Sequence, residues 1–555
     1  MPSTLPKTLL YLLGAIFILN VTQAYFTELI FDEAYYWHYA RNITFGYFDH
    51  PPMVAWFIAL SSLIFEGHLG VRFVSCLLSV GTLLVLWKTI DHPQKNKYAT
   101  HFVVLAFSMT LLNAYGFLTL PDTPLLFFCA LFLLVYKRFV EKPGIGLAIA
   151  LGMVMAALMY SKYHAVLIIV FVLLSNLKLL KNTYAWLAVL VALLAYTPHF
   201  LWLYEQDFIS IKYHLSERKN GPYDFNKYTL GFLVNLVALF GFTFPWIYRS
   251  LFRTRSKDVF TKALLFLTYG VLLFFFISSF NRRVQTQWII VVSIPLVILV
   301  FRDMMADETS RKWIYRMGIL NIVILLYLRL GLVFEPLFPI YYESHGNKKW
   351  VQQLKDKVGD TPVVFENSYR LAPMYAYYSG NTSFSLNNIN YRQNQYSLDD
   401  SERNVQLRKV YYVSPFLKNA ELAFENAKGK PYFGHYINQF ESFRKLRCIV
   451  DGDAFSLDTE KERLVKIFNP YDEDIDLQKL KFAVGYLDDY KQLQEVIPIY
   501  VSATDENISV LKSNDTTNFT FRLPPPKTKT PDYFRLSISE KDLRFGLNGK
   551  TIKLD

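Results

Sequence analysis

The sequence has few cysteines and few charged residues for its length. Three cysteines occur in 555 residues, and two of them, Cys76 and Cys129, lie inside apolar segments. They therefore do not form the disulfide framework of a secreted domain. Charged residues make up 19% of the chain, against 52% hydrophobic and 17% aromatic residues. The loops between the apolar runs hold no Gly-rich phosphate cradle. This composition is typical of a membrane protein.

The apolar runs predict eleven membrane spans. Several are close to the ~20 residues that a helix needs to cross the hydrocarbon core. Lys7 ahead of the first run resembles the start of a signal peptide, but no convincing cleavage site follows, so we expect a retained anchor. The predicted spans cover residues 8–26, 69–90, 99–120, 124–140, 144–161, 164–180, 184–204, 228–249, 260–280, 284–301 and 314–335.

The net charge of +12 is distributed as in a membrane protein, not as in a nucleic-acid-binding protein. If the amino terminus is cytoplasmic, every second loop lies inside, and each of these loops is net positive, which is the positive-inside pattern. Examples are Lys137/Arg138/Lys142 and Arg302/Arg311/Lys312/Arg316. An odd number of spans then puts the carboxyl-terminal region outside.

The segment from Glu28 to Trp56 is too polar and too long for an ordinary hairpin between spans. Asp32 and Glu33 lie near its start, and Asp49-His50-Pro51-Pro52 follows, where two prolines favour an extended backbone. The apolar residues 53–65 are long enough for a helix along the membrane surface. Taken alone, this pattern also suits an interfacial loop whose acids face water.

The order of these motifs resembles that of the family 39 glycosyltransferases. An acidic pair follows the first span, Tyr47–Pro52 comes next, and Arg72 begins the second span. The family comprises protein O-mannosyltransferases and bacterial relatives, including the aminoarabinose transferases that modify lipid A. The similarity covers about the first 300 residues and fades over the last 200. It implies a polytopic α-helical GT-C fold in the bacterial cytoplasmic (inner) membrane.

The predicted orientation places further charged residues on the outer face. Asp122 lies in a turn between spans and matches the second acid of the family, although it also suits a helix cap. Lys162 matches a motif of the bacterial relatives, although a lysine at a helix end commonly snorkels. Arg282 and Arg283 precede Trp288 and suit phosphate recognition, although they also suit anchoring at the headgroups.

The resemblance implies a membrane glycosyltransferase that moves a sugar from a polyprenyl-phosphate donor to an extracytoplasmic acceptor, with inversion. The short inside loops leave no room for a nucleotide-sugar domain, so the donor must be lipid-linked. A lipid phosphate is a good leaving group, so the reaction needs one base and several cations.

The expected partners are this donor, membrane lipids and a lipid A, glycan or protein acceptor, without nucleic acid. The resemblance makes Asp32 the base, supported by Glu33, and Asp122 an acceptor-orienting second acid. It leaves a divalent metal open, with Asp32, Glu33 and Asp122 as ligands if one binds. The expected donor-binding residues are His50, Arg72, Lys162, Arg282 and Arg283.

The domain organisation follows from a change in composition after Phe338, where charged residues become more frequent and the apolar runs shorten to strand length. We expect a transmembrane catalytic domain over 1–338, an extracytoplasmic α/β domain over 339–445 and a β-sandwich-like domain over 446–555. Two alternatives stay open: a lipid-linked-sugar flippase or transporter, and an oligosaccharide ligase or polymerase with a diphosphate-linked donor. Against the flippase, the charges gather at one face and no inverted repeat is visible.

Overall fold

Helices form nearly all of the regular structure up to residue 345, and strands form most of it thereafter. The computed structural model describes residues 5–452, 454–505, 508–527 and 530–555. The chain divides into two compact units. The first comprises Met1–Phe208 and Tyr223–His345, and the second comprises Ile209–Pro222 and Gly346–Asp555.

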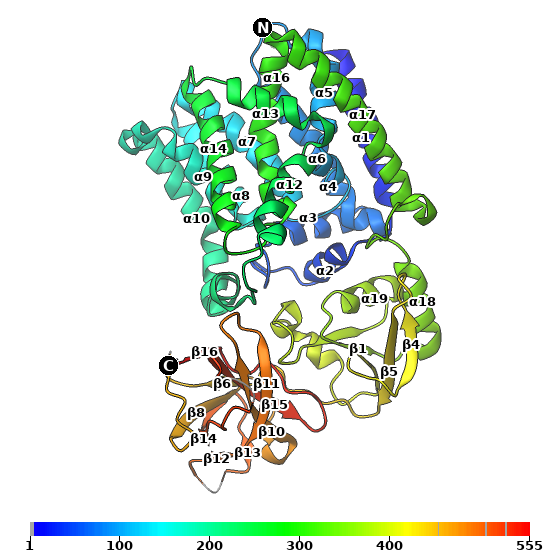
Figure 1. The fold of residues 1–555 in the computed structure, drawn as a ribbon, viewed down its shortest axis with the longest axis vertical. Helices are drawn as coiled ribbons and strands as arrows, with labels where there is room; N and C mark the ends of the chain where they lie inside the picture. Colours follow the sequence, from blue (N-terminus) through cyan, green and yellow to red (C-terminus); the bar gives the residue numbers. More distant parts are fainter. Residues whose placement is uncertain (1–4, 453, 506–507, 528–529) are drawn as a thin grey trace. The chain divides into compact units, whose positions relative to one another are not determined.

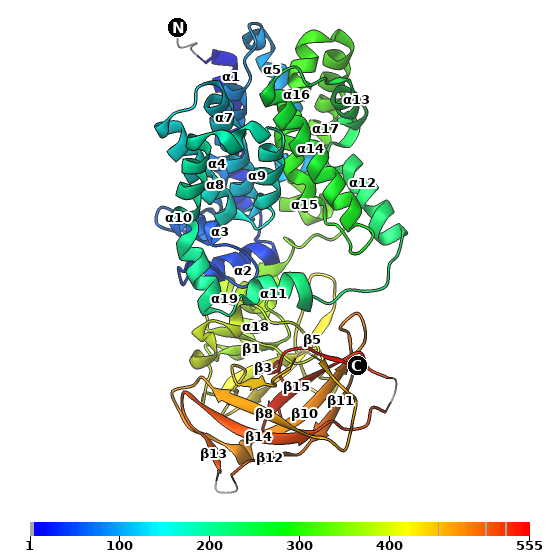
Figure 2. The ribbon, with the colours of Figure 1, turned by 90° about the vertical axis from the view of Figure 1, so that its left-hand side faces the viewer.

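The first unit is a helical bundle (Figures 1 and 2). Among the described residues, seven helices are long and apolar enough to cross a membrane, or eight if one bent pair counts as a single span. This confirms the polytopic helical fold. The long helices are α1 (Lys7–Phe26), α4 (Gly67–Thr89), α7 (Asp122–Glu141), α10 (Thr183–Glu205), α14 (Val259–Ser278), α15 and α16 together (Thr286–Ala306), and α17 (Glu308–Val333).

Shorter helices occupy the other segments that were predicted to span. The predicted span over 99–120 is interrupted near Ser108, where the amide of Thr110 instead donates to the Leu239 carbonyl at 3.2 Å. The predicted surface helix over 53–65 is helical only as far as Ser62. The count of eleven spans therefore stays a prediction. The shorter helices are α2 (Phe31–Ala40), α3 (Met53–Ser62), α5 (Ala99–Phe107), α6 (Thr110–Ala114), α8 (Ile145–Ser161), α9 (Ala165–Leu174), α12 (Gly231–Ala238) and α13 (Phe244–Arg253).

The predicted span over 228–249 is bent by 92° between residues 226–238 and 241–253. Gly241 lies at the break with φ of +53°, a conformation that favours glycine. Asn321 on α17 satisfies the backbone on both sides of the break. Its Nδ2 donates to the Phe240 carbonyl at 2.8 Å, and its Oδ1 accepts from the Phe242 amide at 3.0 Å. A polar side chain of another helix thus stabilises the bend.

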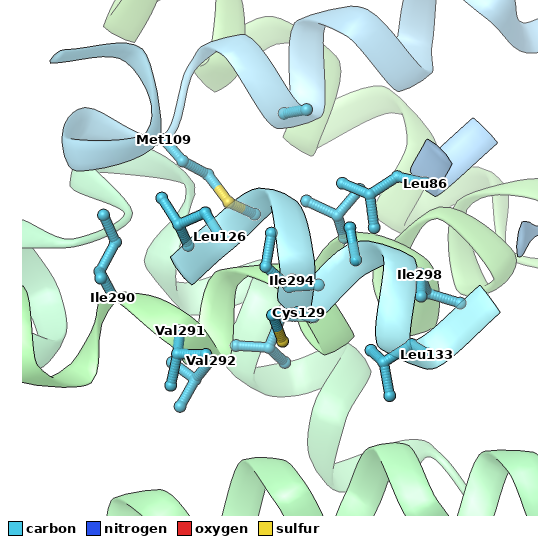
Figure 3. Close-up of a cluster of buried hydrophobic side chains, with 14 of the residues drawn as sticks. Leu86, Met109, Leu126, Cys129, Leu133, Ile290, Val291, Val292, Ile294 and Ile298 are labelled. Carbon is cyan, nitrogen blue, oxygen red and sulfur yellow. The ribbon is translucent and has the colours of Figure 1, made fainter. Parts of the chain in front are cut away.

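Buried apolar side chains from α4, α7 and α16 meet in the core of the first unit (Figure 3). Leu86 on α4, Cys129 on α7 and Ile294 on α16 have no exposed surface. Close packing of this kind allows little movement of one helix against another. It therefore fixes the positions of α4 and α7, whose second and first turns carry Arg72 and Asp122 respectively.

The second unit begins with an α/β layer. Its five-stranded sheet has the order β2-β1-β3-β5-β4, with β1 parallel to β2 and β3, and β5 antiparallel to its neighbours. The helices and strands expected over 350–358, 362–365, 371–378 and 409–413 are confirmed. The elements are α18 (Asn347–Val358), β1 (Val363–Glu366), α19 (Leu371–Ser379), β2 (Ser383–Leu386), β3 (Val410–Ser414), β4 (Glu421–Glu425) and β5 (Pro431–Ile437).

Two further sheets, of orders β11-β10-β15-β16-β7 and β12-β14-β8-β6, share one apolar core. Buried and exposed residues alternate along β8, so one of its faces packs inward, as in a sandwich. The strands expected over 518–521, 533–536 and 551–554 are confirmed. The strands are β6 (Arg447–Ile449), β7 (Ala454–Phe455), β8 (Glu462–Asn469), β10 (Leu480–Leu487), β11 (Leu493–Ile499), β12 (Val501–Ala503), β14 (Asp515–Arg522), β15 (Tyr533–Glu540) and β16 (Ile552–Leu554), and a separate pair is formed by β9 (Ile475–Asp476) and β13 (Val510–Leu511).

One segment of the expected transmembrane domain belongs instead to the second unit. Residues 209–222, which include α11 (Ile209–Lys212), follow α10 in the chain but contact the β-rich region. The amide of Asn220 donates to the Tyr490 carbonyl at 3.2 Å, and Gln492 Nε2 donates to the Asn220 carbonyl at 3.0 Å. The expected boundary at 445/446 lies within the second unit and stays a prediction.

Candidate functional site

Arg72 and Glu33 form a fully buried ion pair that joins α4 to α2. Arg72 Nε donates to Glu33 Oε1 at 2.7 Å, and Nη2 donates to Oε2 at 2.5 Å. Arg72 Nη1 donates to the carbonyls of Ala24 and Thr27 at 3.0 and 2.6 Å, and Nη2 also donates to that of Glu28 at 3.0 Å. A guanidinium has five N–H groups, so these contacts occupy all of them.

This arrangement does not favour the expected binding of the donor phosphate by Arg72, which stays a prediction. The side chain has no exposed surface, and every N–H group already has a partner within the first unit. Arg72 instead ties α4 to the end of α1 and the start of α2. Glu33 shares this structural role, because its oxygens also accept from the amides of Ile30 at 3.2 Å and Thr119 at 2.9 Å. Glu33 therefore supports its neighbour and does not shape an open acceptor pocket.

Asp32 differs from Glu33 in being partly exposed, in the first turn of the same helix. Its carboxylate acts electrostatically on the partly buried Tyr342 and the buried Tyr115. Burial raises the pKa of Tyr342 to about 12, and the charges of Glu343, Glu33 and Asp32 add to that rise. The buried Glu33–Arg72 pair anchors the helical turn that also carries Asp32.

Asp122 and Lys162 form a second buried ion pair. Lys162 Nζ donates to Oδ1 of Asp122 at 2.7 Å and to Oδ2 at 2.9 Å, and both side chains are about 5% exposed. The pair borders a cavity of about 10 Å³ that is also lined by His164 and Trp288. The sequence predicted both residues on one face but not their pairing, because 40 residues separate them in the chain.

Tyr115 lies within electrostatic reach of Asp32 and Asp122, and the sequence did not predict it as a site residue. Its side chain is 7% exposed, and the charges of both Asp122 and Asp32 act on its hydroxyl. Tyr342 also acts on it. No motif in the sequence marks either tyrosine, since aromatic residues are frequent throughout the chain. Asp32 and Asp122 therefore both lie within electrostatic reach of Tyr115.

Tyrosines of α2 anchor the segment that contains His50. Asp49 accepts hydrogen bonds from Tyr35 Oη at 3.0 Å and Tyr39 Oη at 3.4 Å. His50 itself is partly exposed and lies edge-on to Tyr36, with 5.7 Å between the ring centroids. The segment is thus folded back onto the helix that carries Asp32.

His199 on α10 fixes the other side of the same loop. Its Nδ1 lies 2.6 Å from the Phe45 carbonyl, and its Nε2 lies 3.2 Å from Tyr163 Oη. Gly46 lies against Trp202 so closely that an added Cβ would come within 2.2 Å of the indole. Only glycine allows this approach of the loop to α10. His199 and Trp202 therefore hold this loop against α10.

Arg282 and Arg283 lie in the loop between α14 and α15, and Arg283 is exposed. The loop leads into Trp288, whose ring stacks at a tilt against His164, with 5.4 Å between the centroids. In the same loop, the carbonyl of Val284, which follows Arg283, accepts a hydrogen bond from Asn235 Nδ2 at 3.2 Å. The loop therefore adjoins the cavity of the Asp122–Lys162 pair, and the two arginines remain donor-binding candidates.

The three acids suggested as metal ligands do not fit a metal site. Glu33 has both oxygens occupied by Arg72 and by backbone amides, and Asp122 is bound by Lys162. Across the described ranges, no group of three or more His, Cys, Asp or Glu side chains is arranged to hold a metal ion. We therefore derive no step through a metal.

Comparison with known proteins agrees with this fold. Residues 49–202 match the family model described as dolichyl-phosphate-mannose-protein mannosyltransferase. The chain is 25% identical over 290 residues to the lipid A galacturonosyltransferase RgtD of Rhizobium johnstonii. That alignment covers 49% of this chain and 60% of the relative, so the chain spans less than two thirds of it.

The structure also resembles two crystal structures of ArnT from Cupriavidus metallidurans, one in the apo state and one bound to undecaprenyl phosphate. Each has a TM-score of 0.55 and 12% sequence identity, and covers 77% of this chain and 98% of that chain. This likeness shows the fold, a polytopic GT-C membrane fold followed by a β-rich region. The matches together confirm the resemblance to GT-C glycosyltransferases of the aminoarabinose transferase type. The protein is a multi-pass membrane protein.

Proposed function

We propose that the protein is a glycosyltransferase that moves a sugar from a polyprenyl phosphate to a lipid, glycan or protein acceptor. The observation that carries the proposal is a partly exposed Asp32 and a buried Asp122–Lys162 pair, whose acids both lie within electrostatic reach of Tyr115. The similarity to a lipid A galacturonosyltransferase and the fold shared with an undecaprenyl-phosphate-bound ArnT support it. A lipid A acceptor is favoured by the first of these relatives.

The reaction requires a base on one side of the sugar and cations on the other. Asp32 takes the proton from the acceptor hydroxyl as its oxygen forms a bond with the anomeric carbon. The bond from that carbon to the phosphate oxygen breaks, and its electron pair leaves with the lipid phosphate. Attack opposite the leaving group inverts the anomeric configuration. The proton ends on Asp32 and the negative charge on the phosphate.

Lys162, which pairs with Asp122, is a proposed cation of the site. An ammonium has three N–H donors, so its two contacts with Asp122 do not exhaust it. Asp122 positions this ammonium and orients the acceptor. His50, Arg282 and Arg283 are proposed to bind the sugar and the phosphate, the arginines through bidentate hydrogen bonds. Stabilising the departing phosphate in a site that excludes water lowers the barrier.

The proposed location is the bacterial cytoplasmic (inner) membrane, with the active site and the second unit on the extracytoplasmic side. Every second loop of the first unit is positively charged. The positive-inside rule places these loops on the cytoplasmic side of the membrane. On this orientation Asp32, Asp122 and Lys162 face outward, where a lipid-linked donor is available. A nucleotide sugar would not reach them.

The experiment that tests the function is sugar transfer by the full chain in liposomes. The liposomes contain an undecaprenyl-phosphate-linked sugar and lipid A, and the wild type is compared with Asp32→Asn. Transfer by the wild type and its loss in the variant, with equal donor binding, is the expected result. Lipid flipping without transfer in the wild type would show a flippase instead. Activity only with a diphosphate-linked donor would indicate a ligase or polymerase.

A further inference from the structure

A pocket of about 250 Å³ opens in the second unit, and we call it the basic pocket. Segments far apart in the sequence form it, namely the chain after α11, the turn around residue 391, the hairpin of β10 and β11, and β15. Five basic side chains and one acidic side chain line it. These are Arg218, Lys219, Arg392, Lys491, Arg535 and Glu217. The excess of positive charge favours an anion.

Arg535 provides a second observation that points to a ligand. It lies on the central strand β15 and is only 8% exposed. Its Nη2 donates to Thr551 Oγ1 at 2.5 Å, but its buried Nε has no hydrogen-bond partner. A buried N–H group without an acceptor is costly and uncommon in folded proteins. An anionic oxygen in the pocket would satisfy it.

The two lysines are held in place by backbone contacts. Lys219 Nζ donates to the Asn390 carbonyl at 3.0 Å, and Lys491 Nζ donates to the Ser216 carbonyl. Desolvation lowers the pKa of both lysines, and the charge of Arg535 lowers each further, whereas Glu217 opposes this at Lys491. Cations are thus crowded together in a partly dehydrated site. A bound anion relieves both the repulsion and the lost hydration.

The walls between these charges suit a sugar. Arg392 stacks over Tyr213 and Tyr369, at 5.2 and 4.4 Å from the ring centroids, which fixes its guanidinium. Tyr391 and Gln393 add a flat face and an amide to the lining. The volume lies just below the usual range of ligand pockets, roughly 300–1,000 Å³, so the pocket has room for one sugar ring rather than lipid chains.

We propose that the basic pocket binds a phosphate monoester carried by a sugar ring. Several donors converge on one anion, and a phosphate offers three oxygens and up to two charges where a carboxylate offers two oxygens and one. The site goes beyond the proposed transfer reaction, because none of its lining residues belongs to the Asp32–Asp122 site. The sugar phosphate can be the headgroup of a glycolipid or a soluble molecule.

The test is calorimetric titration of the full chain in nanodiscs with glucose 1-phosphate, glucose, inorganic phosphate and glucuronate. We expect glucose 1-phosphate to bind, at least tenfold more tightly than the other three, and more weakly as salt is added. If none of the four compounds shows detectable binding at millimolar concentration, the proposal is overturned. So does binding of inorganic phosphate or glucuronate as tight as that of glucose 1-phosphate.

Competition distinguishes the two sources of the sugar phosphate. Diphosphoryl lipid A in the nanodiscs is expected to displace glucose 1-phosphate if the pocket takes a glycolipid headgroup. Displacement by soluble hexose phosphates alone assigns the pocket to a soluble ligand, and the proposal stands in either case. Because transfer activity is not measured here, failure of this site leaves the proposed function unaffected.

Variants locate the binding site. Arg535→Gln is expected to weaken glucose 1-phosphate binding by roughly 10- to 150-fold, as for loss of a charged hydrogen bond. Lys219 is exposed, so Lys219→Gln tests the same site if Arg535→Gln unfolds the protein. Lys461→Gln, an exposed substitution in the same unit outside the pocket, is the matched control. Unchanged affinity in folded Lys219→Gln and Lys491→Gln proteins overturns the assignment.

Discussion

Arg72 donates hydrogen bonds to both carboxylate oxygens of Glu33, at 2.7 and 2.5 Å, although 39 residues separate the two in the chain. Both side chains are fully buried. Adjacent acids in one turn thereby acquire different roles. Glu33 is neutralised inside the protein and holds the helix, whereas Asp32, one position earlier, keeps its carboxylate at a partly exposed surface.

Replacing Arg72 with alanine should unfold the protein more easily without weakening donor binding in the molecules that stay folded. The substitution leaves the Glu33 carboxylate buried and unpaired, which costs about 3–5 kcal/mol. Thermal unfolding in detergent measures the first effect, and titration with undecaprenyl phosphate measures the second. Asp472→Asn is a control, since it removes an ion pair with Arg403 in which both side chains are exposed, a change worth about 0–1 kcal/mol. If Arg72→Ala has normal stability but has lost donor affinity, Arg72 binds the donor.

Asp32→Asn should reduce turnover by roughly 10²–10⁴, because the amide keeps the shape but cannot accept the proton. Donor affinity and the unfolding temperature should stay near those of the wild type, since Asp32 is only partly buried. Steady-state kinetics with a fixed donor concentration measure the loss. Near-normal turnover would remove Asp32 as the base and turn attention to Asp122.

The Asp122–Lys162 pair can be tested with a double-mutant cycle. Lys162→Met should lower both stability and activity, because it leaves a buried carboxylate unpaired. Adding Asp122→Asn should restore much of the stability, since no charge then remains buried. If Lys162 binds the donor phosphate, the double variant stays inactive despite its recovered unfolding temperature. Recovery of activity together with stability would mean that the pair is only structural.

Gly241→Ala should destabilise the first unit by about 1–2 kcal/mol, because alanine is strained at positive φ. The added Cβ would also lie 2.6 Å from Asn321 Nδ2, which caps the bend. Gly14→Ala is the control, since that glycine lies within α1 with no atom within 4 Å of an added Cβ. The control should be neutral or slightly stabilising, and equal effects at both positions would contradict the role given to the bend.

A periplasmic reporter such as alkaline phosphatase, fused after Asp555, should be active. The alternation of positive loops along the first unit predicts that the second unit lies outside the cytoplasm. External protease applied to intact spheroplasts should cleave within the second unit. A protected second unit, with an active cytoplasmic reporter at the same place, would reverse the proposed orientation of the site.

The sequence by itself determined the helical membrane part and the change to strands. Apolar runs long enough to span are local features, and the periodicities of 3.6 and 2 that separate helix from strand are local too. For this reason the long helices, the elements at 350–378 and the strand β14 were predictable from the residues that form them. The motif order also pointed to Asp32 and Asp122. The bend at Gly241 was not predictable, because a side chain on another helix stabilises it.

The tertiary structure alone decided which charged residues are available for function. An arginine near a helix start looks the same in sequence whether it binds a phosphate or a buried glutamate. Only the tertiary structure shows that Arg72 on α4 pairs with Glu33 on α2. Tyr115 and the basic pocket are further examples, since their partners come from distant segments. Pairing of buried charges depends on which side chains the fold brings within about 4 Å, and the short-range pattern of the chain does not contain that information.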